Sequence, residues 1–329
     1  MTPFEYAQPT TEGQVVELLH ESAEDSVVLA GGTHLVDLMR ENVLRPRRVV
    51  NLQDVASLRS IEVQPQQVVV GALTTLSDLA QHPVLADFRS LHDVIDGIRA
   101  IQVQQNGTLG GDLCVLPNCW YFRSGYGLLA LQNGESLPEL GDNRYHAIFG
   151  NAGPAKFVSA SRFAPGLIAL NASVRVIGPQ PELETVVPLA NFYQTPASES
   201  DRHVRLLPGQ IISHIIIPTE RQHTATYEVL ESEGLDWPQA AAAVSLSMEK
   251  GRVQTARIVL GHVAPEPWEV AEAAASLLGY PVNQDTASRA AELAVSGATP
   301  LSMNAYKVHM AQTCVERALL RAVDKLRLS

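Results

Sequence analysis

Two short glycine-rich segments are the parts of this sequence best suited to hold a charged ligand. The first is Ala30-Gly31-Gly32-Thr33-His34-Leu35, where an apolar strand ends, two glycines turn the chain and a helix begins. Glycine lets the backbone approach a ligand closely, and the free N–H groups at a helix start favour an anion. Alone, a Gly-Gly pair before a helix is more often an ordinary turn, and the spacing is not the G-x-G-x-x-G of a Rossmann unit.

The second segment is Asn106-Gly107-Thr108-Leu109-Gly110-Gly111-Asp112-Leu113, with three glycines in five residues and one hydroxyl. A turn of this kind can present successive backbone N–H groups to an anion. Two such loops in one chain favour binding of a diphosphate more than either loop does alone.

The sequence contains few residues in the patterns typical of metal sites or catalytic nucleophiles. The three cysteines are Cys114, Cys119 and Cys314, whereas an iron–sulfur cluster generally needs four thiolates. The sequence contains no C-x-x-C, no H-E-x-x-H and no G-x-S-x-G. We therefore expect no metal site.

Charge and composition exclude several classes of partner. The net charge of −11 should repel nucleic-acid phosphates and anionic lipid surfaces, so neither kind of partner is expected. No run of 18 apolar residues could span a membrane, and the N-terminus lacks the pattern of a secretory signal. Three cysteines make no disulfide framework, so the expected location is cytoplasmic.

Hydrophobic periodicity predicts an α+β protein with two domains. The N-terminal fifty residues alternate strand and helix as a small βαβ unit, with helices over 12–20 and 33–40 and strands over 27–30 and 49–52. A strand over 68–72 runs into residues that can cap a helix. Strands over 172–178 and 211–217, separated by prolines, indicate an antiparallel sheet packed by helices.

The C-terminal third has a different pattern. Strands are predicted over 240–248 and 253–260, followed by helices over 268–279, 286–296 and 305–327. A polar stretch, 221–224, precedes this part. We therefore place a domain boundary near residue 222, between an N-terminal domain, 1–222, and a C-terminal domain, 223–329.

The motifs together resemble a known family. In addition to the two glycine loops, the matching segments are Cys119–Arg123, Asp142–Ile148, Gly261–Trp268 and Asn304–Val308. The chain resembles the FAD-binding medium subunit of the xanthine dehydrogenase and carbon monoxide dehydrogenase family, nearly end to end. Within that family it is most similar to the aldehyde oxidoreductase and 4-hydroxybenzoyl-CoA reductase branches. The resemblance implies a vanillyl-alcohol-oxidase (PCMH-type) FAD-binding fold followed by a small α+β domain.

The resemblance also implies cofactor contacts and partners. The backbone of Ala30–Leu35 and Thr108–Asp112 would hold the FAD diphosphate, through Ala30, Gly31, Gly32, Thr33, His34, Leu35, Thr108, Gly110, Gly111 and Asp112. Thr75 and Ile212 would contact the rest of the cofactor. A large subunit with the molybdenum cofactor and a small subunit with [2Fe–2S] clusters would supply electrons.

Several positions depart from the family pattern. Cys119 matches the first ligand of an extra [4Fe–4S] cluster found in this branch, but 124–140 contains no cysteine and Ala155 stands at the last ligand position. We therefore predict that this cluster is absent. Arg162 replaces an aspartate that would contact the ribityl chain, and Val229 stands near a lysine position beside the flavin ring. Gln104-Gln105 replace a common Arg-Asn.

Two functions follow from these matches and departures. The first is an electron-transfer flavoprotein subunit that passes electrons from iron–sulfur centres to an acceptor. The alternative is a stand-alone biosynthetic enzyme, self-associating and acting on its own small-molecule substrate. In that enzyme FAD would be redox-active, or only structural in a non-redox step such as a cyclisation. Tyr126, Tyr145 and His146 are candidate substrate contacts, whereas His34 is expected to be a solvated residue of the capping turn.

Overall fold

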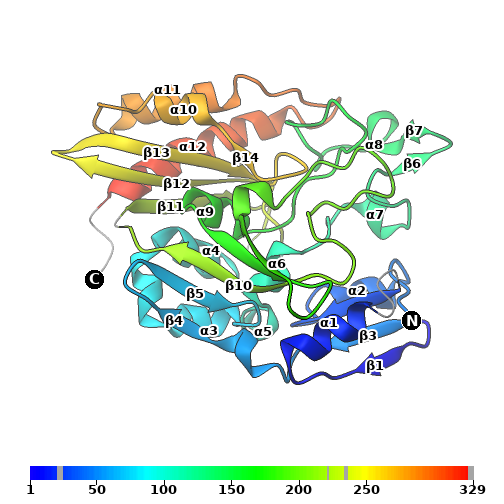
Figure 1. The fold of residues 1–329 in the computed structure, drawn as a ribbon. Coiled ribbons are helices and arrows are strands. Elements are labelled where there is room, and N and C mark those ends of the chain that lie inside the picture. The colour runs from blue at the N-terminus through cyan, green and yellow to red at the C-terminus, as the bar shows by residue number, and fades with distance from the viewer. Residues whose placement is uncertain (21–24, 221, 233–235, 325–329) are drawn as a thin grey trace.

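The fold consists of three main β-sheets, a short hairpin and packed helices, as the predicted α+β class requires (Figure 1). The computed structural model describes residues 1–20, 25–220, 222–232 and 236–324. None of the helices in these ranges is long and apolar enough to cross a membrane.

The N-terminal unit is the predicted βαβ arrangement. Strands β1 (Glu5–Ala7), β2 (Ser26–Leu29) and β3 (Arg48–Asn51) form a parallel sheet in the order β1-β3-β2. Helices α1 (Glu12–His20) and α2 (Leu35–Arg40) make the crossovers. Buried Val15, Val16 and Leu19 of α1 pack against the sheet. Parallel strands end at a common edge, so the loop after β2 opens at the carboxyl edge of this sheet.

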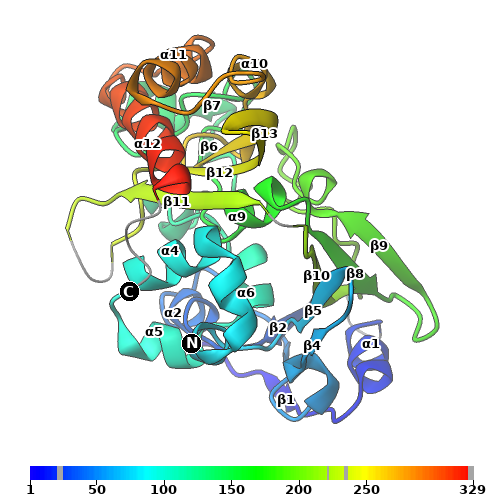
Figure 2. The same cartoon turned by 90° about the vertical axis from the view of Figure 1, so that its left-hand side faces the viewer.

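The second unit is the predicted antiparallel sheet. Its five strands lie in the order β4-β5-β10-β8-β9, with bounds Ile61–Val63, Gln67–Gly71, Ile211–Pro218, Ser173–Ile177 and Glu184–Pro188. Around it lie helices α3 (Leu76–Gln81), α4 (Arg89–Gly97), α5 (Ile101–Asn106), α6 (Leu109–Leu113) and α9 (Ala164–Ala169), and Figure 2 shows several of them stacked beside the sheet. The largest apolar core of the described residues lies in this unit.

The third unit is a four-stranded sheet covered on its outer side by helices (Figure 1). Its strands are β11 (His223–Val229), β12 (Ala240–Glu249), β13 (Arg252–Gly261) and β14 (Trp268–Glu269), in sequence order. Helices α10 (Ala271–Ala275), α11 (Gln284–Val295) and α12 (Tyr306–Val323) cover it. Buried alanines on β12, α11 and α12 form much of the interface, since small side chains let the elements approach closely.

A connecting segment leaves the second unit after α6, packs against the third unit and returns to the second unit at α9. It contains the short helices α7 (Trp120–Arg123) and α8 (Leu137–Leu140) and the hairpin of β6 (Leu131–Gln132) and β7 (Glu135–Ser136). Three single-turn 3-10 helices, Ala56–Arg59, Pro83–Asp87 and Leu189–Asn191, complete the described elements.

In the C-terminal third, the bounds of one predicted helix are wrong and one strand was not predicted. The helix predicted over 268–279 begins only at Ala271, because Trp268 and Glu269 form β14 against β13 and the Trp268 ring stacks on Phe149 at 5.6 Å. The strand β11 was not predicted, and its first residues, His223 and Thr224, come from the polar stretch and pair with β12. Tertiary pairing overrides local propensity in both places.

The last helix is shorter than predicted. It ends at Val323, and Asp324 adopts an extended backbone conformation. The predicted continuation over 325–327 lies outside the described residues.

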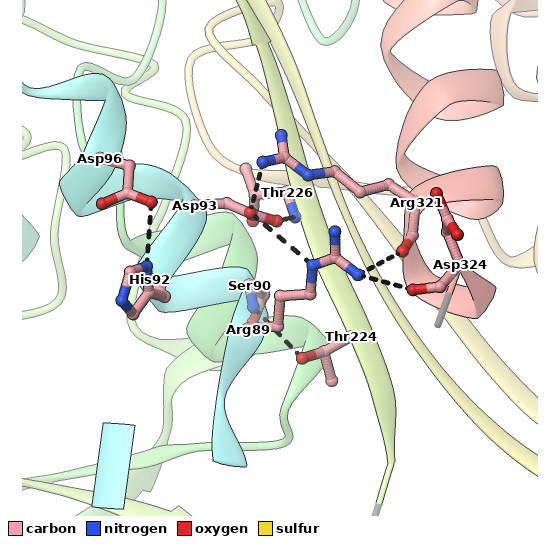
Figure 3. A network of polar contacts seen from close by, with 9 residues as sticks. All are labelled: Arg89, Ser90, His92, Asp93, Asp96, Thr224, Thr226, Arg321 and Asp324. Atoms are coloured by element: carbon pink, nitrogen blue, oxygen red, sulfur yellow. Dashed lines mark hydrogen bonds and ion pairs between the residues drawn. The ribbon is translucent and has the colours of Figure 1, made fainter. Parts of the chain in front are cut away.

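A polar network fastens α4 to the third unit (Figure 3). Arg89 Nη1 donates to the backbone carbonyls of Arg321 at 2.8 Å and Asp324 at 3.1 Å. The carboxylate of Asp93 accepts from the backbone N–H of Thr226 at 3.0 Å and lies 2.9 Å from Nη2 of Arg321. The carboxylate also lies 4.0 Å from Nε of Arg89, so this buried group pairs with one backbone N–H and two guanidinium groups.

We predict that Asp93→Ala lowers the free energy of unfolding by about 1–3 kcal/mol, because it leaves a buried N–H and a guanidinium without their acceptor. Urea denaturation measures the change. His92→Ala on the same helix is the control, since the His92–Asp96 pair is exposed, with side chains 48% and 64% accessible. That control should change the free energy by about 0.5 kcal/mol or less. Equal losses in the two variants would contradict the role given to Asp93.

Candidate functional site

The first glycine loop presents unused backbone donors at the start of α2. Gly32 adopts φ 71°, in the left-handed region that glycine tolerates. The backbone N–H groups of Gly32, Thr33 and His34 find no acceptor within the described ranges, although Val36 and Leu38 already donate inside the helical turn. Free N–H groups at this position suit an anionic group.

The two glycine loops, 76 positions apart when counted from Gly31 to Gly107, are in direct contact. A Cβ on Gly31 would lie 1.7 Å from the carbonyl oxygen of Asn106, so no side chain fits there. A Cβ on Gly111 would lie 3.9 Å from that of Ala30. The two glycine loops therefore lie side by side and form one candidate binding site at the junction of the first and second units.

The backbone N–H groups of Leu109, Gly110 and Gly111 in the second loop already have acceptors within the protein. Leu109 N donates to the carbonyl of Thr74 at 3.1 Å, and Gly110 N to that of Ala72 at 2.9 Å. Gly111 N donates to the side chain of Thr108, the N-cap of α6, at 3.1 Å. This loop is thus fixed to the end of β5, and the free donors come from the first loop.

Thr75 and Ile212 lie beneath the second loop. Thr75 caps α3 by accepting from Asp78 N at 3.0 Å, and its backbone bridges to Thr108. Ile212 is buried in the same core as Leu109 and Leu113 of α6. Both residues therefore lie near the second loop, and their contact with the rest of the cofactor stays a prediction.

Asp112 and Arg162 are occupied by protein partners. The Asp112 carboxylate accepts from Ser161 Oγ at 2.5 Å and from the backbone N–H groups of Arg162 and Phe163 at 3.2 and 3.1 Å. The Arg162 guanidinium forms a buried ion pair with Glu228. Burial raises the pKa of Glu228, and Arg162 opposes that rise. The charge of Arg162 is therefore balanced within the protein.

His34 is not the solvated capping residue that was predicted. Its side chain makes no capping hydrogen bond to α2. The ring is half-buried and packs edge-on against Trp237, with ring centroids 6.1 Å apart, and burial lowers its pKa. Trp237 reaches this position from the stretch before β12, which sequence periodicity does not indicate.

Trp237 also lines a cavity of about 260 Å³. Aromatic side chains form much of its wall, namely Trp120, Tyr145, Phe157 and Trp237, and the polar side chains of Cys119, His146, His262 and Lys307 face it as well. Glu231 and Asp236 add two carboxylates to the lining. The cavity thus lies between the connecting segment and the third unit and shares Trp237 with the first glycine loop.

The structure brings together two of the three candidate substrate contacts. Tyr145 and His146 line the cavity, whereas Tyr126 is 39% exposed and is not among its lining residues. His262 and Lys307 were each part of a quoted motif but were given no role by sequence reasoning. Their convergence with His146 depends on the packing of β13 and α12, which no local pattern reveals.

Cys119 contacts His146 but is not part of a ligand cluster. Its Sγ lies 3.2 Å from Nε2 of His146, and burial raises the pKa of the thiol while lowering that of the imidazole to about 4. Cys119 packs against an apolar cluster that contains Leu129, Ala155 and Phe157. Within the described ranges no three His, Cys, Asp or Glu residues could hold a metal ion together. The residues around Cys119 therefore do not fit a [4Fe–4S] cluster.

Two protein-family models together match nearly the whole chain. Residues 2–220 match the family described as the FAD binding domain in molybdopterin dehydrogenase, and residues 225–322 match the CO dehydrogenase flavoprotein C-terminal domain.

Individual proteins agree with the family match. The carbon monoxide dehydrogenase medium chain of Afipia carboxidovorans is 28% identical over 97% of this chain and 96% of its own length. The aldehyde oxidoreductase FAD-binding subunit of Escherichia coli is 25% identical over 98% and 99%. Among solved structures, a chain of Cu,Mo-CO dehydrogenase in its cyanide-inactivated form superposes with a TM-score of 0.76 at 25% identity, covering 98% of this chain and 99% of that one. The protein therefore belongs to the family of FAD-binding subunits found in molybdopterin dehydrogenases.

Proposed function

We propose that this chain is the FAD-binding subunit of a molybdenum hydroxylase complex and passes electrons from iron–sulfur centres to an acceptor. The observation that carries the proposal is the contact between the two glycine loops, together with the free N–H groups at the start of α2, in a chain that two family models match over 2–220 and 225–322. When bound, FAD supplies a group that can accept electrons and release them again.

The residues proposed to hold FAD are those that the family resemblance implies, and the geometry of the first loop supports them. Gly32, Thr33 and His34 would donate backbone N–H groups to the diphosphate, and Ala30, Gly31 and Leu35 complete that loop. Thr108, Gly110, Gly111 and Asp112 would shape the facing side, with Thr75 and Ile212 beneath. The close approach of Gly31 to Asn106 fits this assignment, because a side chain there would separate the loops.

Charges near the flavin ring should differ from the family pattern. Arg162 at the ribityl position is paired with Glu228, and Gln104 Nε2 donates to the carbonyl of Ile98 at 2.5 Å, which secures the end of α4. Hydrogen bonds and charges near the ring tune flavin potential. We therefore propose that this subunit works at a potential different from that of relatives with an aspartate at this position.

The proposed partners are a large subunit with the molybdenum cofactor and a small subunit with [2Fe–2S] clusters. The support is that relatives matched over nearly their full length are named medium chains. A stand-alone, self-associating enzyme with its own small-molecule substrate is the second candidate, favoured by the cavity that Tyr145 and His146 line. Tyr126 has no such support.

We also propose a two-domain organisation, 1–222 and 223–329, and a cytoplasmic location. The two family models leave 221–224 between them, which supports the boundary. The three cysteines are free thiols, as is usual in a reducing compartment.

Gly31→Ala should weaken FAD binding by at least about tenfold, because its Cβ would push the second loop away from the first. Fluorescence titration of the FAD-depleted chain with FAD measures the affinity. Gly153→Ala is the matched control, since no atom lies within 4 Å of the position its Cβ would take. Unchanged FAD affinity in folded Gly31→Ala protein would contradict the assignment of the loops.

We predict that the extra cluster is absent, because Cys119 contacts His146 and apolar side chains, and among the residues the structure describes no three His, Cys, Asp or Glu could hold a metal ion together. Iron analysis of the anaerobically purified chain should therefore give less than about one iron per chain. About four irons per chain would overturn the prediction.

Co-purification separates the two candidate functions. We expect that a tagged chain, purified from the cells that produce it naturally, brings two other subunits with it. One is the large subunit with bound molybdenum, and the other is the small subunit with bound iron. Recovery of the chain alone, with flavin turnover on a small molecule and no other subunit, would favour the stand-alone enzyme.

A further inference from the structure

We propose that the buried ammonium of Lys307 supplies the positive charge of the cofactor site and favours the reduced, anionic form of bound FAD over the oxidised form. The inference rests on the proposed function and deepens it, because it takes the cavity that adjoins the first loop as the place of the flavin ring. Lys307 lines this cavity, and the first loop borders it through the contact of His34 with Trp237. Uptake of two electrons and one proton leaves one negative charge on the flavin, which a nearby cation stabilises.

Lys307 is held inside the protein by three backbone carbonyls. The residue is 1% exposed, and its Nζ donates to the carbonyls of His262 at 2.8 Å, His146 at 3.1 Å and Tyr145 at 3.3 Å. An ammonium has three N–H donors, so the set is complete. Carbonyl oxygens favour the charged form of the group that donates to them. The ammonium therefore acts on the cavity through its field, which needs no direct contact with a ligand.

The charge of Lys307 is not balanced by a carboxylate among the residues that the structure describes. The contrast is with Lys156, which is also buried but forms an ion pair with Glu139, with Nζ and Oε1 2.5 Å apart. The field of a paired charge is largely cancelled by its partner, whereas an unpaired charge in a poorly solvated place acts over several ångströms. Lys307 thus projects a positive potential into the cavity.

The other basic groups near the cavity do not supply this charge. Burial lowers the pKa of His146 to about 4 and that of His262 to about 3, so both lining rings are neutral at pH 7. The charge of Lys307 contributes to the lowered pKa of both rings, which indicates that its field reaches the lining. The guanidinium of Arg162 is paired with buried Glu228. Within the described ranges, Lys307 is the one unpaired cation of the lining.

The carboxylates of the lining lie nearer to solvent than Lys307 does. Glu231 is exposed and accepts from the hydroxyl of Tyr145 at 2.8 Å, and Asp236 is half-buried and accepts from the backbone N–H of Ser232 at 2.9 Å. Water and salt screen exposed charges far more than buried ones. The deep part of the cavity is therefore positive, although two carboxylates stand at its edge.

The position of the ammonium is fixed by the fold. His262 adopts φ 61°, a strained conformation for a residue other than glycine, and its carbonyl is the nearest acceptor of Lys307. Asn304 donates a further hydrogen bond to the His146 carbonyl at 3.1 Å, which fixes the facing segment. A charge fixed in advance stabilises a new charge without any rearrangement of the protein.

The midpoint potential of bound FAD tests the proposal. Burial lowers the pKa of Lys307 to about 7, so the FAD-loaded chain is titrated with dithionite beside a reference dye at pH 6, where the ammonium is largely protonated. Lys307→Met removes the charge and keeps much of the side-chain length. We expect the affinity for reduced FAD, relative to oxidised FAD, to fall at least about tenfold, which lowers the potential by about 30 mV for a two-electron couple.

Two variants separate charge from structure. Lys156→Met is the matched control, because it removes a buried lysine that has its own carboxylate partner and does not line the cavity. Its ratio of affinities for the two forms of FAD should stay within about threefold of the wild-type ratio. Lys307→Arg keeps the charge and should restore most of the potential that Lys307→Met loses.

A second measurement uses the wild-type chain, so it does not depend on the folding of a variant. The ring hydroxyl of 6-hydroxy-FAD changes the colour of the flavin when it loses its proton, and the anion carries its charge on the ring. Bound to the FAD-depleted wild-type chain, this analogue should ionise with a constant at least about tenfold larger than in free solution, because a cation favours the anion.

The outcomes distinguish this proposal from the proposed function. Bound FAD with an unchanged potential in Lys307→Met, an equal drop in Lys156→Met or Lys307→Arg, or an ionisation of 6-hydroxy-FAD that is unchanged or weakened would each overturn the role of Lys307 alone. A wild-type chain that binds neither FAD nor the analogue would overturn the proposed function together with it.

Discussion

The contact between Gly31 and the carbonyl of Asn106 is the constraint on which the N-terminal half depends. It joins the parallel βαβ unit to the second unit at a point where Gly31 has no room for a side chain. On one side of this contact the second loop is hydrogen-bonded to the end of β5. On the other side the N–H groups of the first loop are free because they stand at the start of α2, so the proposed cradle for the diphosphate lies at this junction.

The third unit is attached by buried polar groups. Asn143 accepts from Met303 N at 2.8 Å and donates to Ser302 Oγ at 2.9 Å, and Lys307 holds the carbonyls of His146 and His262. The connecting segment therefore cannot shift without breaking bonds to the loop before α12. This attachment, together with the α4 network of Figure 3, places the cavity next to the first loop.

Much of this could be predicted from the sequence, because it depends on local signals. The βαβ unit, the antiparallel sheet and both glycine loops follow from periodicity and glycine placement, and the family resemblance is confirmed by the two matched models. The Trp268 strand was missed because its pairing with β13 is nonlocal, and the half-buried ring of His34 was missed because it depends on Trp237. His262 and Lys307 meet His146 only after β13 and α12 pack together. No spacing rule could have linked them.

The visible absorption spectrum of the purified chain, before and after dithionite, tests the central claim most directly. The account predicts the bands of an oxidised flavin, released as FAD on denaturation, that bleach on reduction and return when an electron acceptor is added. A chain that is colourless and takes up no FAD, or whose bound flavin resists reduction, would contradict it.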